Sequence, residues 1–313
     1  MGRHGGRYAQ HLLRDLPEAR LVAVSRRDAA AGQAFAESHG LRFYADPFRL
    51  VADPGVEAVV VVTPPDLNPS LCQAALDAGK PVLVEKPLAR TAAEAREIAR
   101  RARDGFLMVA HTLRYNAVIR ALRTHRGRIG PVHLISLNQR LEPSPLAWLE
   151  DPQRSGGGNV LHIGVHMFDL VRMLSGAEVV EVFCRTARQK TRQVEDLFTA
   201  SFRLSSGILC TLDSSRASGG RSGRVELVGE RGQLVGDHIH HTLSLIRGWE
   251  ASALDPGPPV HTVQAALADF VAAVRSGAPS PIPAEDGLRA VEIAEACYRS
   301  AREGRAVDVD SSE

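Results

Sequence analysis

The chain has 313 residues, of which 44% are hydrophobic, so it is long enough for one large or two ordinary domains. Its 38 basic and 36 acidic residues leave a formal net charge of +2, which gives no long-range attraction for nucleic acid or an anionic membrane. The four cysteines have neither disulfide nor zinc spacing, and we expect buried thiols in a cytoplasmic protein. No apolar run approaches the roughly 18 residues of a membrane span, and the start lacks the apolar core of a signal peptide.

The first residues predict half of a phosphate-binding turn. Gly2 and Gly5 have the spacing of the second and third glycines of G-x-G-x-x-G, and a helix is expected from about residue 5 to residue 16. The alternative is a glycine-rich, disordered N-terminus. Met1 would stand between the first and second glycines, and the strand that should precede the turn has no counterpart in the sequence.

The absent strand would lie at the centre of the sheet. Burying about five apolar side chains there contributes roughly 10 kcal/mol. The whole stability of a domain is only about 5–15 kcal/mol. We therefore hypothesise that Met1 is an internal codon taken for the start. Reading the upstream codons in frame tests this, because they should encode a short apolar run that ends in Gly.

Strands and helices alternate over the first third of the chain. Strands are predicted over 19–25, 57–63, 81–85 and 106–110, and helices over 28–40, 68–78 and 91–103. Asp28 and Gly40 are typical residues for the two caps of their helix. Residues 57–63 are apolar without alternation, which indicates a strand buried on both faces. This order predicts a parallel Rossmann-type sheet, truncated at its first strand, in a domain of residues 1–115.

The pattern changes after about residue 115. A strand near 131–140 precedes a proline-rich loop over 141–158 and an amphipathic helix over 159–176. A hairpin with Gly207 in its turn, further strands over 223–246, and helices over 262–276 and 284–303 follow. Residues 116–313 are therefore predicted to form an α+β domain on a large, mostly antiparallel open sheet. The fold class of the whole chain is α/β.

The end of the predicted strand over 19–25 favours NADP over NAD. An acidic residue there usually marks NAD, whereas an Arg accommodates the 2′-phosphate of NADP. This chain has Ser25, Arg26 and Arg27 instead, and Asp28 is expected to serve as a helix cap. A hydroxyl and guanidinium groups suit a phosphate. The alternative is that both arginines only coat a surface loop.

Candidate catalytic groups lie in two places. His162, His166 and Asp169 are at i, i+4 and i+7, so one helix face would present all three. Histidine suits proton transfer near neutral pH, and Asp169 would hold the ring of His166 in one tautomer. The ammonium of Lys86, one of only three lysines, would stabilise a developing alkoxide. The alternatives are core histidines and a surface lysine.

The chain resembles the glucose–fructose oxidoreductase / inositol dehydrogenase (Gfo/Idh/MocA) family. The resemblance lies in TPPDLN (63–68), EKP (85–87), GGGNVLHIGVHMFDLVRML (156–174), EDLFTASFRLSSGILCTL (195–212) and the tail over 284–309. It implies hydride transfer between a nicotinamide, NADP by preference or NAD, and a carbon of a sugar, cyclitol or related polyol or keto compound. It also implies that the second domain binds the substrate and that its sheet joins a dimer or tetramer.

The resemblance also implies functions for individual residues. It implies a cofactor lining of Gly2, Arg3, His4, Thr63, Pro64, Asn68 and Glu85. It implies that Lys86 lies beside the nicotinamide and that His166 is the catalytic histidine. His162 stands where the family usually has Asp, and Asn68 stands where it often has His. An imidazole both donates and accepts, unlike a carboxylate, so the orientation of substrate hydroxyls is expected to differ. Arg114, Tyr115, Asn159 and the 141–158 loop are expected to shape the substrate pocket.

Two other interpretations stay open. His-x-x-x-His is also zinc-ligand spacing, but no third ligand beyond Asp169 is evident, so we predict no metal. The histidines of DHIHH (237–241) would alternate along a strand, with His238 and His240 on one face. The second interpretation is that the chain is not an active enzyme but a catalytically weak or inactive nucleotide-sensing regulator on the same fold. NADPH binding with no turnover would favour that reading.

Overall fold

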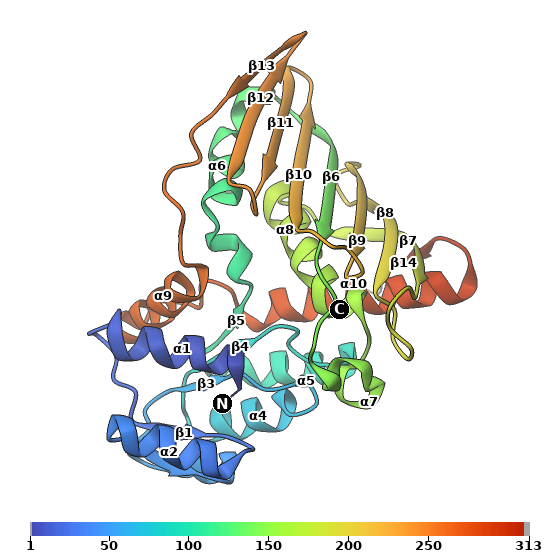
Figure 1. Ribbon diagram of the computed structural model, residues 1–313. Coiled ribbons are helices and arrows are strands. Elements are labelled where there is room, and N and C mark those ends of the chain that lie inside the picture. The colour runs from blue at the N-terminus through green and yellow to red at the C-terminus, as the bar shows by residue number, and fades with distance from the viewer. Residues whose placement is uncertain (1, 310–313) are drawn as a thin grey trace. The chain divides into compact units, whose positions relative to one another are not determined.

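The computed structural model describes residues 2–309 and divides into two compact units, which are treated separately below (Figure 1). Unit 1 comprises Met1–Ala89, Ala93–Thr112 and Val263–Leu288, and unit 2 comprises Arg90–Ala92, Leu113–Thr262 and Arg289–Glu313. The chain therefore passes between the units more than once, and the proposed boundary after residue 115 stays a prediction. Within residues 2–309, no helix has the length and apolar character needed to cross a membrane.

Unit 1 contains the predicted alternation of strands and helices. Its elements are α1 (Arg3–Arg14), β1 (Ala23–Ser25), α2 (Ala29–His39), β2 (Arg42–Tyr44), α3 (Pro47–Ala52), β3 (Val59–Val61), α4 (Asn68–Asp77), β4 (Val82–Glu85), α5 (Ala92–Ala102), β5 (Leu107–Ala110) and α9 (Thr262–Ser276). All strand pairs in this unit are parallel, as predicted. The short elements β2 and α3 were not predicted.

Local signals explain several of these elements. Oδ1 of Asp28 accepts a hydrogen bond from the backbone N–H of Ala31 at 3.0 Å, so it caps α2 as predicted. Gly40 ends the same helix in the left-handed region, with a φ of 65°. Every residue of β4 and of β5 is buried, as expected for parallel strands covered on both faces.

The parallel strands of unit 1 form two separate sheets. Among residues 2–309, β1 pairs only with β2, and β3, β4 and β5 form a second sheet. The Rossmann strand order 3-2-1-4-5-6 places the first strand between the neighbours that correspond to β1 and β3. Met1 lies outside the described residues, and the hypothesis of an internal start stays a prediction.

Unit 2 is built on one nine-stranded sheet. Its strands are β6 (Val132–Arg140), β7 (Val179–Ala187), β8 (Leu197–Leu204), β9 (Leu209–Ser215), β10 (Ser222–Gly229), β11 (Gly232–Asp237), β12 (Thr242–Arg247), β13 (Glu250–Ala253) and β14 (Val307–Asp308). The order is β13-β12-β11-β10-β6-β9-β8-β7-β14, and only the β6–β9 pair is parallel. The prediction of a large, mostly antiparallel open sheet is confirmed. Gly207, with a φ of 84°, occupies the turn of the predicted β8–β9 hairpin.

Helices cover one face of this sheet. They are α6 (Ala117–His125), α8 (Val165–Ser175) and α10 (Ala284–Glu303), with a π-turn η4 (Val160–Gly164) immediately before α8. The short helix α7 (Pro152–Ser155) lies in the loop between β6 and η4. Residues of β8 alternate between buried and exposed, and the rings of Phe168 on α8 and Phe202 on β8 are 5.4 Å apart. In Figure 1, α6 lies along β11 and β12. The opposite face of β8 carries the exposed residues Thr199, Ser201 and Arg203.

The DHIHH histidines do not alternate along a strand, so that prediction is wrong. β11 ends at Asp237 and β12 begins at Thr242, so the histidines occupy the turn between them. Oδ1 of Asp237 accepts hydrogen bonds from the backbone N–H groups of Ile239 and His240, which stabilises this turn. Nε2 of His238 lies 3.0 Å from Oε1 of Gln139, whereas His240 contacts a backbone carbonyl.

The buried ring of His238 predicts a loss of stability in acid. Burial lowers the pKa of His238 from 6.5 to about 4, against a smaller opposing effect of the Asp237 charge. Between those pH values the unfolded chain binds more protons than the folded chain, so stability falls as the pH falls. The shift corresponds to at most roughly 3 kcal/mol. We expect His238→Gln to flatten the pH dependence of the free energy of unfolding between pH 6.5 and pH 4.

Urea unfolding at a series of pH values measures this effect. His133→Gln is the matched control, because His133 is an exposed residue on β6 of the same sheet. A wild-type profile that is already flat over this range would contradict the assignment, and so would an equal change in the His133 variant.

Candidate active site

Most of the predicted cofactor residues of unit 1 follow the carboxyl ends of parallel strands. Ser25, Arg26 and Arg27 lie at the end of β1, and Thr63 and Pro64 follow β3. Glu85 is the last residue of β4, and Lys86 follows it. Because parallel strands point the same way, the ends within each sheet share one edge. Ligands of open α/β sheets bind outside this carboxyl edge.

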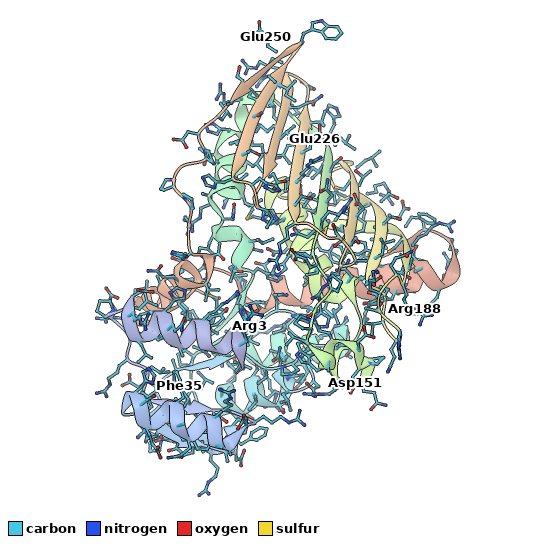
Figure 2. The ribbon with its side chains drawn as sticks, viewed as in Figure 1. Arg3, Phe35, Asp151, Arg188, Glu226 and Glu250 are labelled. Carbon is cyan, nitrogen blue, oxygen red and sulfur yellow. The ribbon has the colours of Figure 1, made fainter. Side chains whose placement is uncertain are left out.

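The N-terminus of α1 offers uncapped backbone donors. Gly2 precedes the helix and no side chain caps it, and the first turn contains no acidic residue. Arg3, labelled in Figure 2, is the first helical residue, and Gly5 is buried. A Cβ on Gly2 would meet no atom within 4 Å, so this end of the helix is open. Free N–H groups and the helix dipole together favour a phosphate.

A buried carboxylate ties α1 to the end of β4. Glu85 is 7% exposed, and its Oε1 lies 2.6 Å from Nε2 of His4 and 2.6 Å from the donating hydroxyl of Tyr8. Its Oε2 accepts the backbone N–H of Lys86 at 3.2 Å. Burial alone would raise the pKa of Glu85, but the hydrogen bonds and charges of His4 and Lys86 outweigh it, so the pKa is lowered. The carboxylate therefore stays ionised and orients the start of the Lys86 loop.

Asn68 connects the ends of β3 and β4. Its side chain is almost completely buried, and its Oδ1 accepts the hydroxyl of Thr63 at 2.7 Å. Its amide donates to the carbonyl oxygens of Glu85 and Pro87. Asn68 therefore holds the chain on both sides of Lys86, which is half-buried. Asn68 has this structural role whether or not it contacts a cofactor. Its contact with the cofactor stays a prediction.

The helix expected over 159–176 begins with a π-turn, which differs from the regular helix of the prediction. His162 lies in η4, whereas His166 and Asp169 lie in the regular helix α8. Nε2 of His162 is 3.0 Å from the carbonyl oxygen of Ser155, and its ring meets Trp148 edge-on at 5.4 Å. His162 is 4% exposed, whereas His166 is half-buried. Single π-turns within helices often occur at functional sites.

Asp169 receives a bidentate ion pair from Arg114. Nε and Nη2 of Arg114 donate to the two carboxylate oxygens at 2.8 Å and 2.5 Å. The Asp169 side chain is 2% exposed and that of Arg114 17%, so the pair is well shielded from water. Tyr115 is buried, with the guanidinium of Arg120 5.0 Å from its ring centroid. Substrate contacts of Arg114 and Tyr115, and an effect of Asp169 on His166, stay predictions.

Glu195 supports the start of the histidine-bearing segment, and the sequence contained no signal for this role. Its Oε1 accepts the backbone N–H of Val160 and the hydroxyl of Tyr298, both at 2.9 Å. Its Oε2 accepts the N–H of Gly158 at 3.2 Å, and its carbonyl oxygen accepts the N–H of Asn159 at 2.8 Å. Burial raises the pKa of Glu195, although these donors oppose the rise.

Asn159, a predicted substrate residue, is buried beside this carboxylate. Its amide group donates to the hydroxyl of Ser214 on β9 at 2.9 Å, which links the start of η4 to the sheet. The side-chain oxygen of Asn159 has no hydrogen-bond partner among residues 2–309. Contact with a substrate stays a prediction.

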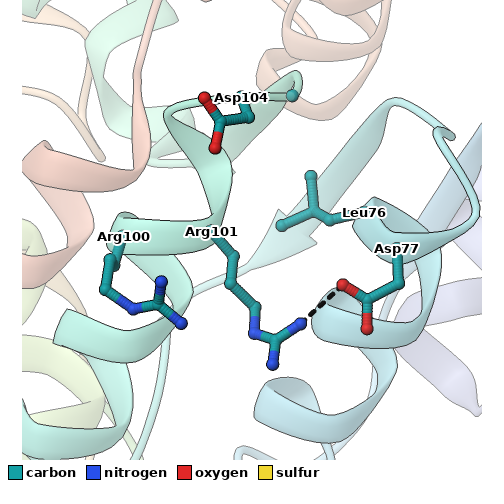
Figure 3. Close-up of a pocket in the computed structure, with 6 residues that line it drawn as sticks. Leu76, Asp77, Arg100, Arg101 and Asp104 are labelled. Carbon is teal, nitrogen blue, oxygen red and sulfur yellow. Dashed lines mark hydrogen bonds and ion pairs between the residues drawn. The ribbon is translucent and has the colours of Figure 1, made fainter.

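A separate hollow in unit 1 lies away from these residues. Its volume is about 290 Å³, and it is lined by the C-terminal ends of α4 and α5, where Arg101 pairs with Asp77 (Figure 3). Both helix ends precede the strands β4 and β5, so the hollow lies at the amino edge of the sheet. It is therefore not part of the cofactor edge.

The comparison with protein families agrees with this arrangement. Residues 1–111 match the description "Oxidoreductase family, NAD-binding Rossmann fold", and residues 124–309 match "Oxidoreductase family, C-terminal alpha/beta domain". The chain belongs to the Gfo/Idh/MocA oxidoreductase family. The resemblance inferred from the sequence motifs is thereby confirmed, and unit 1 contains the family's NAD(P)-binding Rossmann domain.

Relatives of this Gfo/Idh/MocA protein span nearly its whole length. Inositol 2-dehydrogenase 1 of Saccharopolyspora erythraea is 32% identical over 330 residues, covering 98% of this chain and 93% of that protein. The 1,5-anhydro-D-fructose reductase of Ensifer adhaerens is 29% identical over 308 residues, covering 93% and 91%.

Solved structures match the fold of this family member. A putative myo-inositol dehydrogenase of Sinorhizobium meliloti 1021 superposes with a TM-score of 0.84 at 26% identity, over 99% of this chain and 97% of that chain. Levoglucosan dehydrogenase in complex with NADH and L-sorbose gives a TM-score of 0.90 at 20% identity, over 100% of this chain and 98% of that chain. Because the identity is low, this match supports the fold alone.

The residues of this family member fit a dinucleotide. The open N-terminus of α1 can receive phosphate oxygens, and the residues after β1 and β3 lie at the carboxyl edge where the rest of a nucleotide would bind. Among residues 2–309, no group of three or more His, Cys, Asp or Glu side chains is arranged to hold an ion. Within that range, His162 and His166 therefore have no third side chain with which they could form a zinc site.

Proposed function

We propose that this protein transfers a hydride between NADP or NAD and a carbon of a sugar, cyclitol or related polyol or keto compound. The observation that carries the proposal is Lys86, held at the carboxyl end of a fully buried strand by Glu85 and Asn68, in a chain of this oxidoreductase family. The bound nicotinamide would accept or supply the hydride. The relatives named as inositol dehydrogenase and anhydrofructose reductase support the substrate class.

The chain's own groups are proposed to manage the proton and the charge. His166 would take the proton of the substrate hydroxyl during oxidation and return it during reduction, because imidazole titrates near neutral pH. The ammonium of Lys86 would stabilise the negative charge that develops on the substrate oxygen. His162 replaces the carboxylate usual in the family, and its Nε2 lies within hydrogen-bonding distance of the carbonyl oxygen of Ser155, so its ring is already oriented by the backbone.

A substrate panel tests the proposal. The purified chain would be assayed for NADP and NAD reduction with inositols, aldoses and alditols, and for NADPH oxidation with the matching keto compounds. NADPH binding would be measured separately by fluorescence titration. Turnover on at least one member of the class is expected. Tight NADPH binding without turnover on any of them would favour the nucleotide-sensing alternative.

NADP is proposed as the preferred cofactor because of the residues after β1. Arg26 is half-buried and Arg27 is exposed, whereas the carboxylate of Asp28 is engaged as the cap of α2. We expect Arg26→Ala/Arg27→Ala to raise the KM for NADP roughly 10–100-fold, because two charge-assisted contacts to a phosphate are lost. The KM for NAD should change little. Steady-state kinetics with each cofactor provide the measurement.

The matched control for this prediction is Arg20→Ala, because Arg20 precedes β1, at the opposite end of the strand from Arg26 and Arg27. The assignment fails if wild-type protein prefers NAD, or if the double variant weakens both cofactors to the same extent. Homo-oligomerisation through the nine-stranded sheet and a cytoplasmic location stay predictions.

A further inference from the structure

Unit 2 contains a cavity of about 110 Å³ beside the histidine-bearing segment. The Arg216 cavity, as we call it, is lined by Asn159 and His162 of that segment, by Lys190 and Asp196 around the β7–β8 loop, and by Arg216 after β9. Two residues proposed for substrate binding therefore share one cavity with two cationic side chains.

The carboxylates of this cavity already have donors. Asp196 accepts the backbone N–H groups of Gln189 at 2.9 Å and Lys190 at 2.7 Å. Glu195 is held by two backbone N–H groups and a tyrosine hydroxyl, as described above. Glu150 accepts the N–H of Arg192 at 3.1 Å. These acidic groups brace the backbone around the cavity.

The cationic side chains do not have such partners. Within residues 2–309, the guanidinium of Arg216 and the ammonium of Lys190 make no hydrogen bond or ion pair; only their backbone N–H groups are engaged, with Asp196. Arg216 is half-buried, and burial together with the charge of Arg221 lowers its pKa, against an opposing effect of the Asp196 charge. An arginine nevertheless stays charged in a protein. A partly buried guanidinium whose donors make no hydrogen bond or ion pair is costly, so its position favours an anionic ligand.

We propose that the Arg216 cavity binds a carboxylate group of the substrate, so that this protein acts on sugar acids or related hydroxylated carboxylates. This inference rests on the proposed function and narrows its substrate class. The planar guanidinium can donate two parallel hydrogen bonds to a carboxylate.

The size and charge of the cavity favour this group over others. A volume of 110 Å³ takes a carboxylate with a few waters, because one water needs roughly 10–15 Å³ by such a measure, but it is smaller than the usual 300 Å³ or more of a whole-ligand pocket. The three neighbouring carboxylates offset the charges of Arg216 and Lys190. These carboxylates would repel a doubly charged phosphate more strongly than a singly charged carboxylate, so a carboxylate is favoured over a phosphate.

Matched acid and neutral ligands test the proposal. Binding of D-gluconate against D-glucitol, and of D-glucuronate against D-glucose, would be measured by calorimetry in the presence of NADP, with inorganic phosphate as a third probe. At least one acid is expected to bind roughly tenfold or more tightly than its neutral partner, and Arg216→Gln should abolish that preference. Arg188→Gln is the matched control, because Arg188, labelled in Figure 2, lies in the β7–β8 loop but does not line the cavity.

The outcomes separate this inference from the proposed function. Equal binding within both pairs, no binding of either acid, an unchanged preference in Arg216→Gln, or phosphate binding as tight as that of the better acid would overturn the carboxylate subsite. Thermal unfolding of both variants shows whether the fold is kept. Preference for an acid without any oxidation of it would support the subsite and reject the oxidoreductase reaction. Oxidation of the neutral compounds without a preference for acids would support the oxidoreductase reaction and reject the carboxylate subsite.

Discussion

Lys86→Met is expected to lower kcat by about 10²–10³-fold while leaving cofactor affinity and thermal stability close to those of the wild type. Methionine keeps most of the length of lysine but removes the charge that would stabilise the substrate oxygen in the transition state. The fold should tolerate the change because Lys86 is half-buried and follows the fully buried strand β4, whose end is held through Glu85 and Asn68. Steady-state kinetics and an NADPH titration would measure the two effects separately.

Two further variants sharpen this prediction. Lys86→Arg keeps the charge with a different geometry, so it should lose less activity than Lys86→Met. His166→Gln removes the group that moves the proton, and combining it with Lys86→Met should cost much less than the product of the single losses, because both groups serve one step. Near-wild-type kcat in Lys86→Met would show that the ammonium has no part in the reaction.

The second large effect is expected in stability, from Gly158→Ala. A Cβ at this position would stand 1.9 Å from the carbonyl oxygen of Glu195 and 2.8 Å from its backbone nitrogen. The backbone cannot retreat without breaking the bonds by which Glu195 holds Gly158, Asn159 and Val160. We expect unfolding of the variant to require roughly 3 kcal/mol less free energy, and we expect the His162 segment to lose its position.

Chemical denaturation followed by circular dichroism would measure this loss. Gly219→Ala is the matched control in the same unit, because a Cβ there would meet no atom within 4 Å. A Gly158 variant as stable as the Gly219 variant would contradict the close approach of the two backbone segments. Loss of activity in a fully stable Gly158 variant would point instead to a purely local displacement.

Elements with strong local signals were predictable from the sequence. The cap residues of α2, the unbroken apolar runs of β4 and β5, and the Gly207 turn all depend on neighbouring residues, and each is present as expected. The strand predicted over 57–63 is shorter than expected: β3 spans only Val59–Val61, and its middle residue is half-buried. The three-residue strand β2 and the six-residue helix α3 were missed, since so few residues show no period. The nine-residue elements α6 and β7 were also not predicted. The motif residues Lys86 and His166 were recognisable because their types and spacing are local.

Contacts between distant segments could not be predicted in this way. Glu195 lies 37 residues from Gly158, and Arg114 lies 55 residues from Asp169, yet each pair is joined by hydrogen bonds. Asp237 turns DHIHH into a hairpin loop, although its alternating pattern suited a strand.

The sequence by itself therefore determined the family, the order of most of the long elements and the candidate catalytic groups, because composition, periodicity and motif spacing are properties of neighbouring residues. Only the tertiary structure decided which carboxylates are occupied as caps and ion pairs and which cations, such as Arg216, are left for a ligand. The physical reason is that a polar group's partner depends on which distant backbone donors the sheet topology brings within hydrogen-bonding distance.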